Sequence, residues 1–199
     1  MTSNRPAGLA GITARLPGLL LAGLLLVSPL SSAARGGGDY GPEISQREAQ
    51  QQAFGKDASF REMPRDEIDR LAKAAGRTYA EYINTFRIKI WRASVDGAPA
   101  GYFATDAVIG KVEKIDYAVA LDNAGKVQQV FILKYRESHG QEVKRADWLA
   151  QFRGKGAGDP LRLKQDIDNI TGATLSCDHL TDGIRKIARI LAGLAGPSP

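Results

Sequence analysis

KIDYAVALDNAGKVQQVFILKY, residues 114–135, gives the strongest structural signal in this chain of 199 residues. Its first half alternates apolar with other residues, the period-2 pattern of a strand with one buried face. The apolar positions on that face are Ile115, Tyr117, Val119 and Leu121. DNAG (122–125) is typical of a tight turn, and a second apolar run follows it. The segment therefore predicts an antiparallel β-hairpin.

Two further strands are expected before this hairpin. FRIKI (86–90) alternates apolar with basic residues, which fits a half-buried strand. GYFATDAVIG (101–110) indicates another strand with an irregular exit. Asp96-Gly97, between the two, is a turn signal. The antiparallel sheet should thus extend toward the N-terminus from the hairpin.

Helical patterns flank the strands on both sides. SQREAQQQAFG (45–55) and RDEIDRLAKAAG (65–76) precede them, and ADWLAQF (146–152) predicts a short helix after the hairpin. A C-terminal amphipathic helix is predicted from the apolar positions Leu180, Ile184, Ile187, Ala188, Leu191 and Leu194. The expected fold class is α+β, an antiparallel sheet with an N-terminal helical segment and a C-terminal amphipathic helix.

The beginning of the chain has the pattern of an export signal. Arg5 and Arg15 precede an apolar run of 12 residues, and small residues near Ala34 would suit cleavage. The run is shorter than the roughly 20 residues of a spanning helix. No charged residue occurs over 16–34, however, so an uncleaved anchor is the alternative. The expected location is periplasmic or otherwise extracytoplasmic, either free or membrane-associated.

Three parts are expected along the chain: a signal peptide over 1–34, a tether and helical region over 35–84, and a folded domain over 85–199. RGGGDYGP (35–42) has the composition of a flexible tether. Cys177 is the single cysteine, which excludes an internal disulfide. Lys and Arg number 27 against 22 Asp and Glu, without a block of like charge. This balance does not favour nucleic-acid binding.

The sequence argues against several common kinds of site. GKGAG (154–158) lacks the spacing of a dinucleotide fingerprint and is followed by Asp-Pro. His139 and His179 lie forty residues apart. Cys177, Asp178 and His179 are adjacent, so they cannot all face one metal ion from a helix. No metal site is therefore predicted.

DNITGATLSCDHL (168–180) carries the candidate site. Gly172 allows a tight turn, and Ala173 keeps that bend uncrowded. A helix that begins here presents unpaired N–H groups and a positive dipole end, which favour a phosphate. The alternative is that Thr174 or Ser176 serves only as the N-cap of the helix.

Asp168, Thr171, Gly172, Ala173 and Thr174 form the pattern D-x-x-T-G-A-T, which resembles the flavinylation motif of the FMN-binding domain family. Members of that family include the C subunit of the sodium-pumping NADH:quinone reductase, the G subunit of the Rnf complex and the periplasmic domain of NosR. The resemblance covers about residues 85–192 and includes ESHGQE and WLAQFRGK. Residues 35–84 resemble the family only loosely.

The resemblance implies FMN bound through a phosphoester to the Thr174 hydroxyl, placed there by a periplasmic transferase that takes FMN from FAD. Asp168 would be recognised by the transferase or would order the turn. Thr171 would form a hydrogen bond with the turn or with a phosphate oxygen. The flavin ring needs apolar faces and a few polar edge contacts. The other candidate contacts are Leu175, Ser176, Tyr102, Tyr135, Trp148, Glu137, Ser138, His139, Gly140 and Lys155. The alternative for the aromatic residues is that they only pack in the core. The alternative for the polar residues is that they are solvated surface residues without a contact to the cofactor.

These features predict an exported flavoprotein that carries electrons from a membrane donor to an extracytoplasmic acceptor. The alternative is a binding or sensory module of the same fold with no redox role. A self-sufficient oxidoreductase is less expected, because the chain has two histidines and no carboxylate pair at convincing spacing. The identities of the donor and the acceptor are not encoded in any motif.

Overall fold

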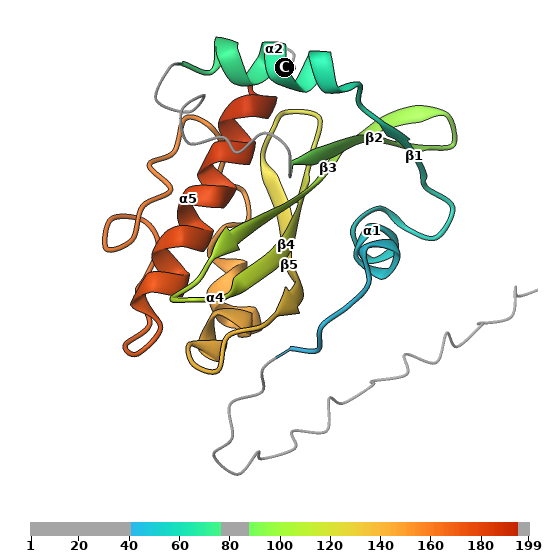
Figure 1. Cartoon of the computed structure of the whole chain (residues 1–199). Helices are drawn as coiled ribbons and strands as arrows, with labels where there is room; N and C mark the ends of the chain where they lie inside the picture. Colours follow the sequence, from blue (N-terminus) through green and yellow to red (C-terminus); the bar gives the residue numbers. More distant parts are fainter. Residues whose placement is uncertain (1–40, 77–87, 195–199) are drawn as a thin grey trace, which may run out of the picture. The chain divides into compact units, whose positions relative to one another are not determined.

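The structure is a computed structural model that describes residues 41–76 and 88–194. Its strands are β1 (Ser59–Glu62), β2 (Lys89–Val95), β3 (Ala98–Ile109), β4 (Lys114–Leu121) and β5 (Val127–Tyr135). They form one antiparallel sheet in which each strand pairs with the next strand along the chain (Figure 1). Helices precede and follow this sheet, so the expected α+β class is confirmed.

Turn chemistry explains two of the strand connections, β2 to β3 and β4 to β5. Asp96 and Gly97, between β2 and β3, have φ values of 50° and 78°, and two positive φ angles are the mark of a type I′ hairpin turn. Between β4 and β5, the Asp122 carboxylate accepts hydrogen bonds from the backbone N–H groups of Ala124 and Lys126 at 2.9 and 2.8 Å. Both expected turns and the expected hairpin are therefore present.

The described helices are α1 (Gln46–Phe54), α2 (Arg65–Ala74), α4 (Ala146–Ala150) and α5 (Thr174–Leu191), together with a short 3-10 helix, η1 (Gln141–Lys144). The three shorter α-helices lie where the patterns predict them. In α1, Ser45 and Glu48 form a capping box, in which each side chain accepts a hydrogen bond from the backbone of the other. Helix α5 begins at Thr174, before the first apolar position that predicted it, Leu180.

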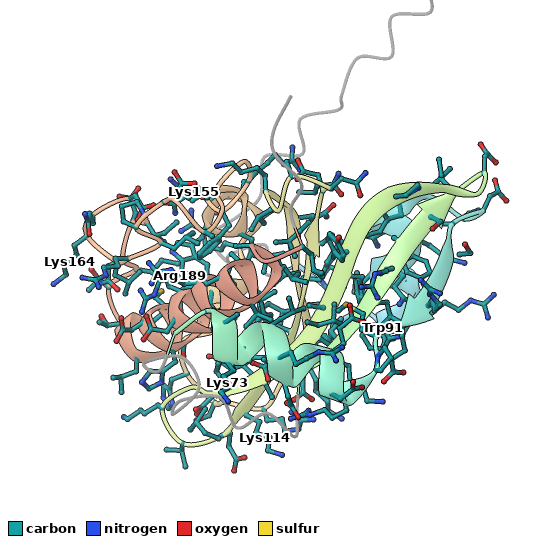
Figure 2. All side chains as sticks on the ribbon, turned by 90° about the horizontal axis from the view of Figure 1, so that it is seen from above. Lys73, Trp91, Lys114, Lys155, Lys164 and Arg189 are labelled. Carbon is teal, nitrogen blue, oxygen red and sulfur yellow. The ribbon has the colours of Figure 1, made fainter. Side chains whose placement is uncertain are left out.

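Both faces of the sheet are apolar, and helices cover each of them (Figure 1). The larger core lies between the sheet and helices α2, α4 and α5. It includes the four hairpin residues predicted to share one face, which are Ile115, Tyr117, Val119 and Leu121. A smaller core packs Trp91, Phe103 and Phe131 against α1, and Figure 2 shows Trp91 well separated from α5.

The segment before β2 belongs to the same fold as the sheet. β1 pairs with β2, and α2 buries Ile68 and Ala72 in the core that it shares with α5. The expected division between 35–84 and 85–199 therefore does not mark a break in packing among the described residues. The predicted export signal, most of the tether and the first residues of FRIKI lie outside the described residues. None of the described helices has the length and apolar character needed to cross a membrane.

A buried polar cluster holds α5 against β3 and β4. Lys186 Nζ lies 2.5 Å from Asp106 Oδ2, and the Tyr117 hydroxyl donates to the same oxygen at 3.1 Å. Gly183 permits this close approach, because a methyl group in its place would overlap the Tyr117 hydroxyl. Burial, and then the charge of Asp106, raises the pKa of Tyr117 well above its usual value, so this hydroxyl remains a donor.

Candidate functional site

The motif residues form a turn that leads directly into α5. Gly172 has φ of +90°, in the left-handed region that glycine tolerates, so the expected tight turn is present. Ala173 is buried at the N-cap, and its carbonyl accepts a hydrogen bond from Cys177 N at 2.9 Å. Thr174 is thus the exposed first residue of a helix of 18 residues.

The expectation that Thr174 or Ser176 caps this helix is wrong. Ala173 occupies the cap position, and no side chain among the described residues accepts a capping hydrogen bond. The Thr174 Oγ1 atom instead accepts a hydrogen bond from Asn169 Nδ2 at 3.1 Å, and the Ser176 side chain is buried. The N–H groups of the first turn therefore have no side-chain cap, which leaves the positive end of the helix dipole available to an anion.

Residues of α4 and of the segment just after it hold the motif loop through its backbone. Trp148 Nε1 donates to the Asp168 carbonyl at 2.7 Å, and Asp168 N donates to Gln151 Oε1 at 2.8 Å. Trp148 is 3% exposed and packs edge to face on Phe152, so the structure supports its core alternative. The Asp168 carboxylate is exposed and makes no hydrogen bond within the described residues. The backbone of Asp168 therefore orders the loop, and the carboxylate of Asp168 faces solvent.

The ESHG loop (137–140) lies against the start of α5. The Tyr135 hydroxyl donates to the His139 carbonyl at 2.6 Å and lies 3.4 Å from Ser176 Oγ. A methyl group at Gly140 would lie 3.0 Å from that hydroxyl and 3.1 Å from Ser176 Oγ, so a side chain would crowd both. Burial raises the pKa of Tyr135, although its hydrogen bond with Ser176 acts in the opposite direction. The structure therefore brings together four of the candidate residues at the start of α5: Tyr135, His139, Gly140 and Ser176.

Glu137 supports the turn between β3 and β4. Its buried carboxylate oxygen Oε1 accepts hydrogen bonds from the backbone N–H groups of Val112 and Glu113 at 2.5 and 2.7 Å. Burial alone would raise the pKa of Glu137, but these two bonds and one from Lys111 N outweigh it and lower the pKa. The ionised carboxylate is thus already engaged by the protein. The contact of Glu137 with the edge of a cofactor stays a prediction. The hydrogen bonds from Val112 and Glu113 do not favour it, because they already occupy the carboxylate.

Ser138, His139 and Thr171 remain at the surface. Ser138 Oγ lies 2.9 Å from His139 Nδ1, and both side chains are exposed. The exposed Thr171 hydroxyl forms no hydrogen bond within the described part of the chain. Their contacts with a cofactor stay predictions. Over 41–76 and 88–194, no three His, Cys, Asp or Glu side chains gather as metal ligands.

Two other candidates lie away from the motif or have partners of their own. Tyr102 precedes Ile109 by seven residues in β3, or about 23 Å along the strand. It lines a separate cavity of about 370 Å³ together with Arg92. Lys155 Nζ lies 3.4 Å from the Asp166 carboxylate, in the loop region that Figure 2 shows on the other side of α5 from Lys114. Neither residue is brought to Thr174 by an observed contact.

Three large apolar side chains are exposed at the start of α5, at the end of β3 and in the turn that follows β3. Among the described residues these are Leu175, Ile109 and Val112, at 48%, 44% and 71% exposure, and we call them the apolar patch. His179, one turn after Leu175, has its Nδ1 atom 2.6 Å from the Ile109 carbonyl, which joins the helix to the end of β3. Val112 lies in the turn that Glu137 holds. The apolar patch was only partly expected, because Leu175 alone was a sequence candidate.

A comparison with known protein families bears on this same region. Residues 110–189, from the end of β3 through most of α5, match the model of the FMN-binding domain. This segment is an FMN-binding domain. It contains the ESHG loop, the motif and two members of the apolar patch, Val112 and Leu175. No curated protein matches the chain.

The residues of the FMN-binding domain fit the cofactor in its name. An exposed hydroxyl on an uncapped helix start, at Thr174, suits a phosphate group. The apolar patch suits the faces of a flavin ring. Asn169 Oδ1 is buried without a hydrogen-bond partner in the described part of the protein, so it can accept a bond from a ligand. The cofactor would supply redox chemistry, while the protein holds and orients it.

Proposed function

We propose that this protein is an exported flavoprotein that carries electrons through an FMN joined by a phosphoester to Thr174. The observation that carries this proposal is the difference in exposure between two neighbouring hydroxyl groups. Thr174 is exposed at the first position of α5, whereas Ser176 is 3% exposed and lies against Tyr135. A transferase must reach the hydroxyl that it modifies, so Thr174 is the better acceptor of the two.

Attachment is a phosphoryl-type transfer in which FAD is the donor. A bond forms between the Thr174 oxygen and the FAD phosphorus nearest the riboflavin part, and the pyrophosphate P–O bond to that phosphorus breaks. AMP leaves, and the hydroxyl proton passes to a base of the transferase. The uncapped N–H groups of α5 favour the resulting phosphodiester, and the exposed Asp168 carboxylate offers the transferase a recognition group.

The side chains near the site suit an electron carrier better than a self-sufficient enzyme. His179 is engaged by the Ile109 and Gly110 carbonyls, and His139 is an exposed loop residue beside Ser138. General acid–base catalysis needs a group that is held in position and can exchange a proton with a substrate, and neither histidine is arranged in this way. A flavin can accept two electrons and pass them on singly without such a group. A membrane donor and an extracytoplasmic acceptor are the partners that this role requires.

The proposal is tested by producing the protein in cells that contain the FMN transferase and then denaturing it. Wild type and Ser176→Ala should remain fluorescent after denaturation, and Thr174→Val should lose all covalent flavin while it keeps its fold. Covalent flavin retained in Thr174→Val would contradict the assignment.

Two further measurements test export and the carrier role. The mature protein should begin near Ala34 or Arg35 by intact mass, whereas a full-length chain in the membrane fraction would support the anchor alternative. Flavinylated protein should be reduced by dithionite and reoxidised by an artificial acceptor, with negligible NADH oxidation. Rapid NADH turnover by the isolated protein would make it an enzyme, and a flavin that cannot be reduced would favour the binding module.

A further inference from the structure

The Asn169 side chain contacts the proposed acceptor hydroxyl. It occupies the first unspecified position of D-x-x-T-G-A-T, so the motif itself assigns it no role. Its Nδ2 atom donates to Thr174 Oγ1 at 3.1 Å. Its Oδ1 atom is buried and has no hydrogen-bond partner among the described residues. The Nδ2 end of the amide therefore contacts Thr174, and the Oδ1 end has no partner in the described part of the chain.

A buried amide oxygen without a donor is unfavourable, because it has lost its hydrogen bonds to water and gained none in return. Such an atom in a folded protein calls for a partner, and residues 41–76 and 88–194 do not supply one. Asn169 is also held in place from both sides. Trp148 and Gln151 bind the backbone of the preceding residue, Asp168, and Ala173 N donates to the Ile170 carbonyl at 3.0 Å. The backbone on both sides of Asn169 is therefore held, and the contact with Thr174 orients its amide.

We propose that Asn169 is a positioning residue for flavin attachment, with one contact to Thr174 and one to the flavin. Its Nδ2 group orients the Thr174 hydroxyl, and its Oδ1 atom accepts a hydrogen bond from a hydroxyl group of the ribityl chain. This inference rests on the proposed function. It adds a residue that controls how fast the cofactor is attached and how firmly it is then held.

The chemistry of the flavin selects the ribityl chain as the partner of Oδ1. The phosphate that joins Thr174 offers only acceptor oxygens at neutral pH, so it cannot satisfy another acceptor. The ribityl chain follows the phosphate directly and carries hydroxyl donors, whereas the N–H group of the ring lies at its far end. A donor close to Thr174 must therefore come from the ribityl chain.

The contact from Nδ2 can persist through the transfer. An amide N–H needs only a lone pair, which the Thr174 oxygen has both as a hydroxyl and as an ester oxygen. During the transfer this oxygen gains negative character as its proton leaves, and a donor already in place stabilises that charge. Asn169 therefore acts on the rate of attachment as well as on the stability of the product.

The test compares rates of covalent flavin incorporation with limiting transferase, followed by the fluorescence of denatured samples. Asn169→Ala should slow incorporation about tenfold, the factor that corresponds to one lost hydrogen bond. Asn169→Asp should slow it further, because it replaces the donor with a carboxylate that repels the phosphate. Gln165→Ala is the matched control, an exposed amide in the same loop, and should match the wild-type rate.

Thermal unfolding separates a positioning role from a merely structural one. Asn169→Ala removes the unsatisfied oxygen, so the Tm of the protein without flavin should stay within about 2 °C of wild type or rise. The rise in Tm on flavinylation should be smaller than in wild type. Equal incorporation rates in wild type and both Asn169 variants would overturn this inference alone. Wild-type protein without covalent flavin would instead overturn the proposed function, and this inference with it.

Discussion

The start and the middle of α5 have different roles, although they belong to one continuous helix. Around Gly183 and Lys186 the helix is buried against the sheet and joined to Asp106 by an ion pair. At its start, Thr174 and Leu175 face solvent, and the contacts come from loops. Nine residues, or about 14 Å of helix, separate Thr174 from Gly183. Anchorage and the proposed chemistry therefore lie far enough apart to be altered independently.

Substitutions in the two parts should consequently have opposite signatures. A change in the anchored middle should lower the free energy of unfolding and leave flavin attachment intact in the folded protein. A change at the exposed start should affect attachment or the environment of the flavin and leave stability almost unchanged.

Lys186→Met should remove about 3 kcal/mol from the free energy of unfolding, because it leaves the Asp106 carboxylate buried without its cation. Denaturant titration of the protein without flavin measures this loss. Lys73→Met, at an exposed lysine of α2, is the control and should stay within about 0.5 kcal/mol of wild type. The folded fraction of Lys186→Met should still acquire covalent flavin. Wild-type stability in this variant would mean that the cluster does not anchor α5.

Glu137→Gln should cost about 1 kcal/mol at pH 7, because a neutral amide oxygen replaces a charged acceptor of the Val112 and Glu113 N–H groups. Folding lowers the pKa of Glu137 from its ordinary value of 4.5, so the stabilisation is present above pH 4.5. It is lost as the pH falls through the lower folded-state pKa. Urea titrations between pH 7 and pH 3 should therefore show a smaller loss in the variant than in wild type. Parallel pH curves for the two proteins would contradict this role of Glu137.

Leu175→Ala should change the free energy of unfolding by no more than about 0.5 kcal/mol, because the side chain is 48% exposed. Its effect should appear only with flavin attached. Loss of part of the apolar patch should make flavin fluorescence more sensitive to iodide quenching. Lys164→Ala, at an exposed loop lysine, is the control and should quench like wild type. Equal quenching in Leu175→Ala and wild type would exclude Leu175 from the flavin environment.

Local sequence signals were sufficient for most of the fold. Alternating apolar residues and turn chemistry predicted the β4–β5 hairpin, and β3 lies where a strand was expected. The strand expected over 86–90 overlaps β2 only at Lys89 and Ile90, and β2 continues to Val95. β1 was missed because SFRE has one apolar residue and depends on pairing with β2, in which Ser59 lies opposite Ser94. The apolar pattern placed the start of α5 at Leu180, after its observed start at Thr174, because the first turn carries few of the apolar residues that indicate a helix.

The site was predictable only as far as the motif extended. The resemblance selected Thr174, but the capping role considered for Thr174 or Ser176 failed because Ala173 takes the N-cap position. The role of Glu137 depends on a turn 24 residues away in the sequence, and no local pattern reveals such a contact. Asn169 could have been suspected as a polar side chain within the motif, but only the folded loop shows that it reaches Thr174.

Peptide mapping of protein made with the transferase tests flavin attachment at Thr174 most directly. Trypsin should release residues 165–185 as one peptide, which holds Thr171, Thr174 and Ser176 together. In wild type this peptide should carry the mass of one FMN less one water, and fragmentation should locate it on Thr174. The corresponding peptide of Thr174→Val should be unmodified. An adduct on Thr171 or Ser176, or an unmodified wild-type peptide, would contradict the assignment.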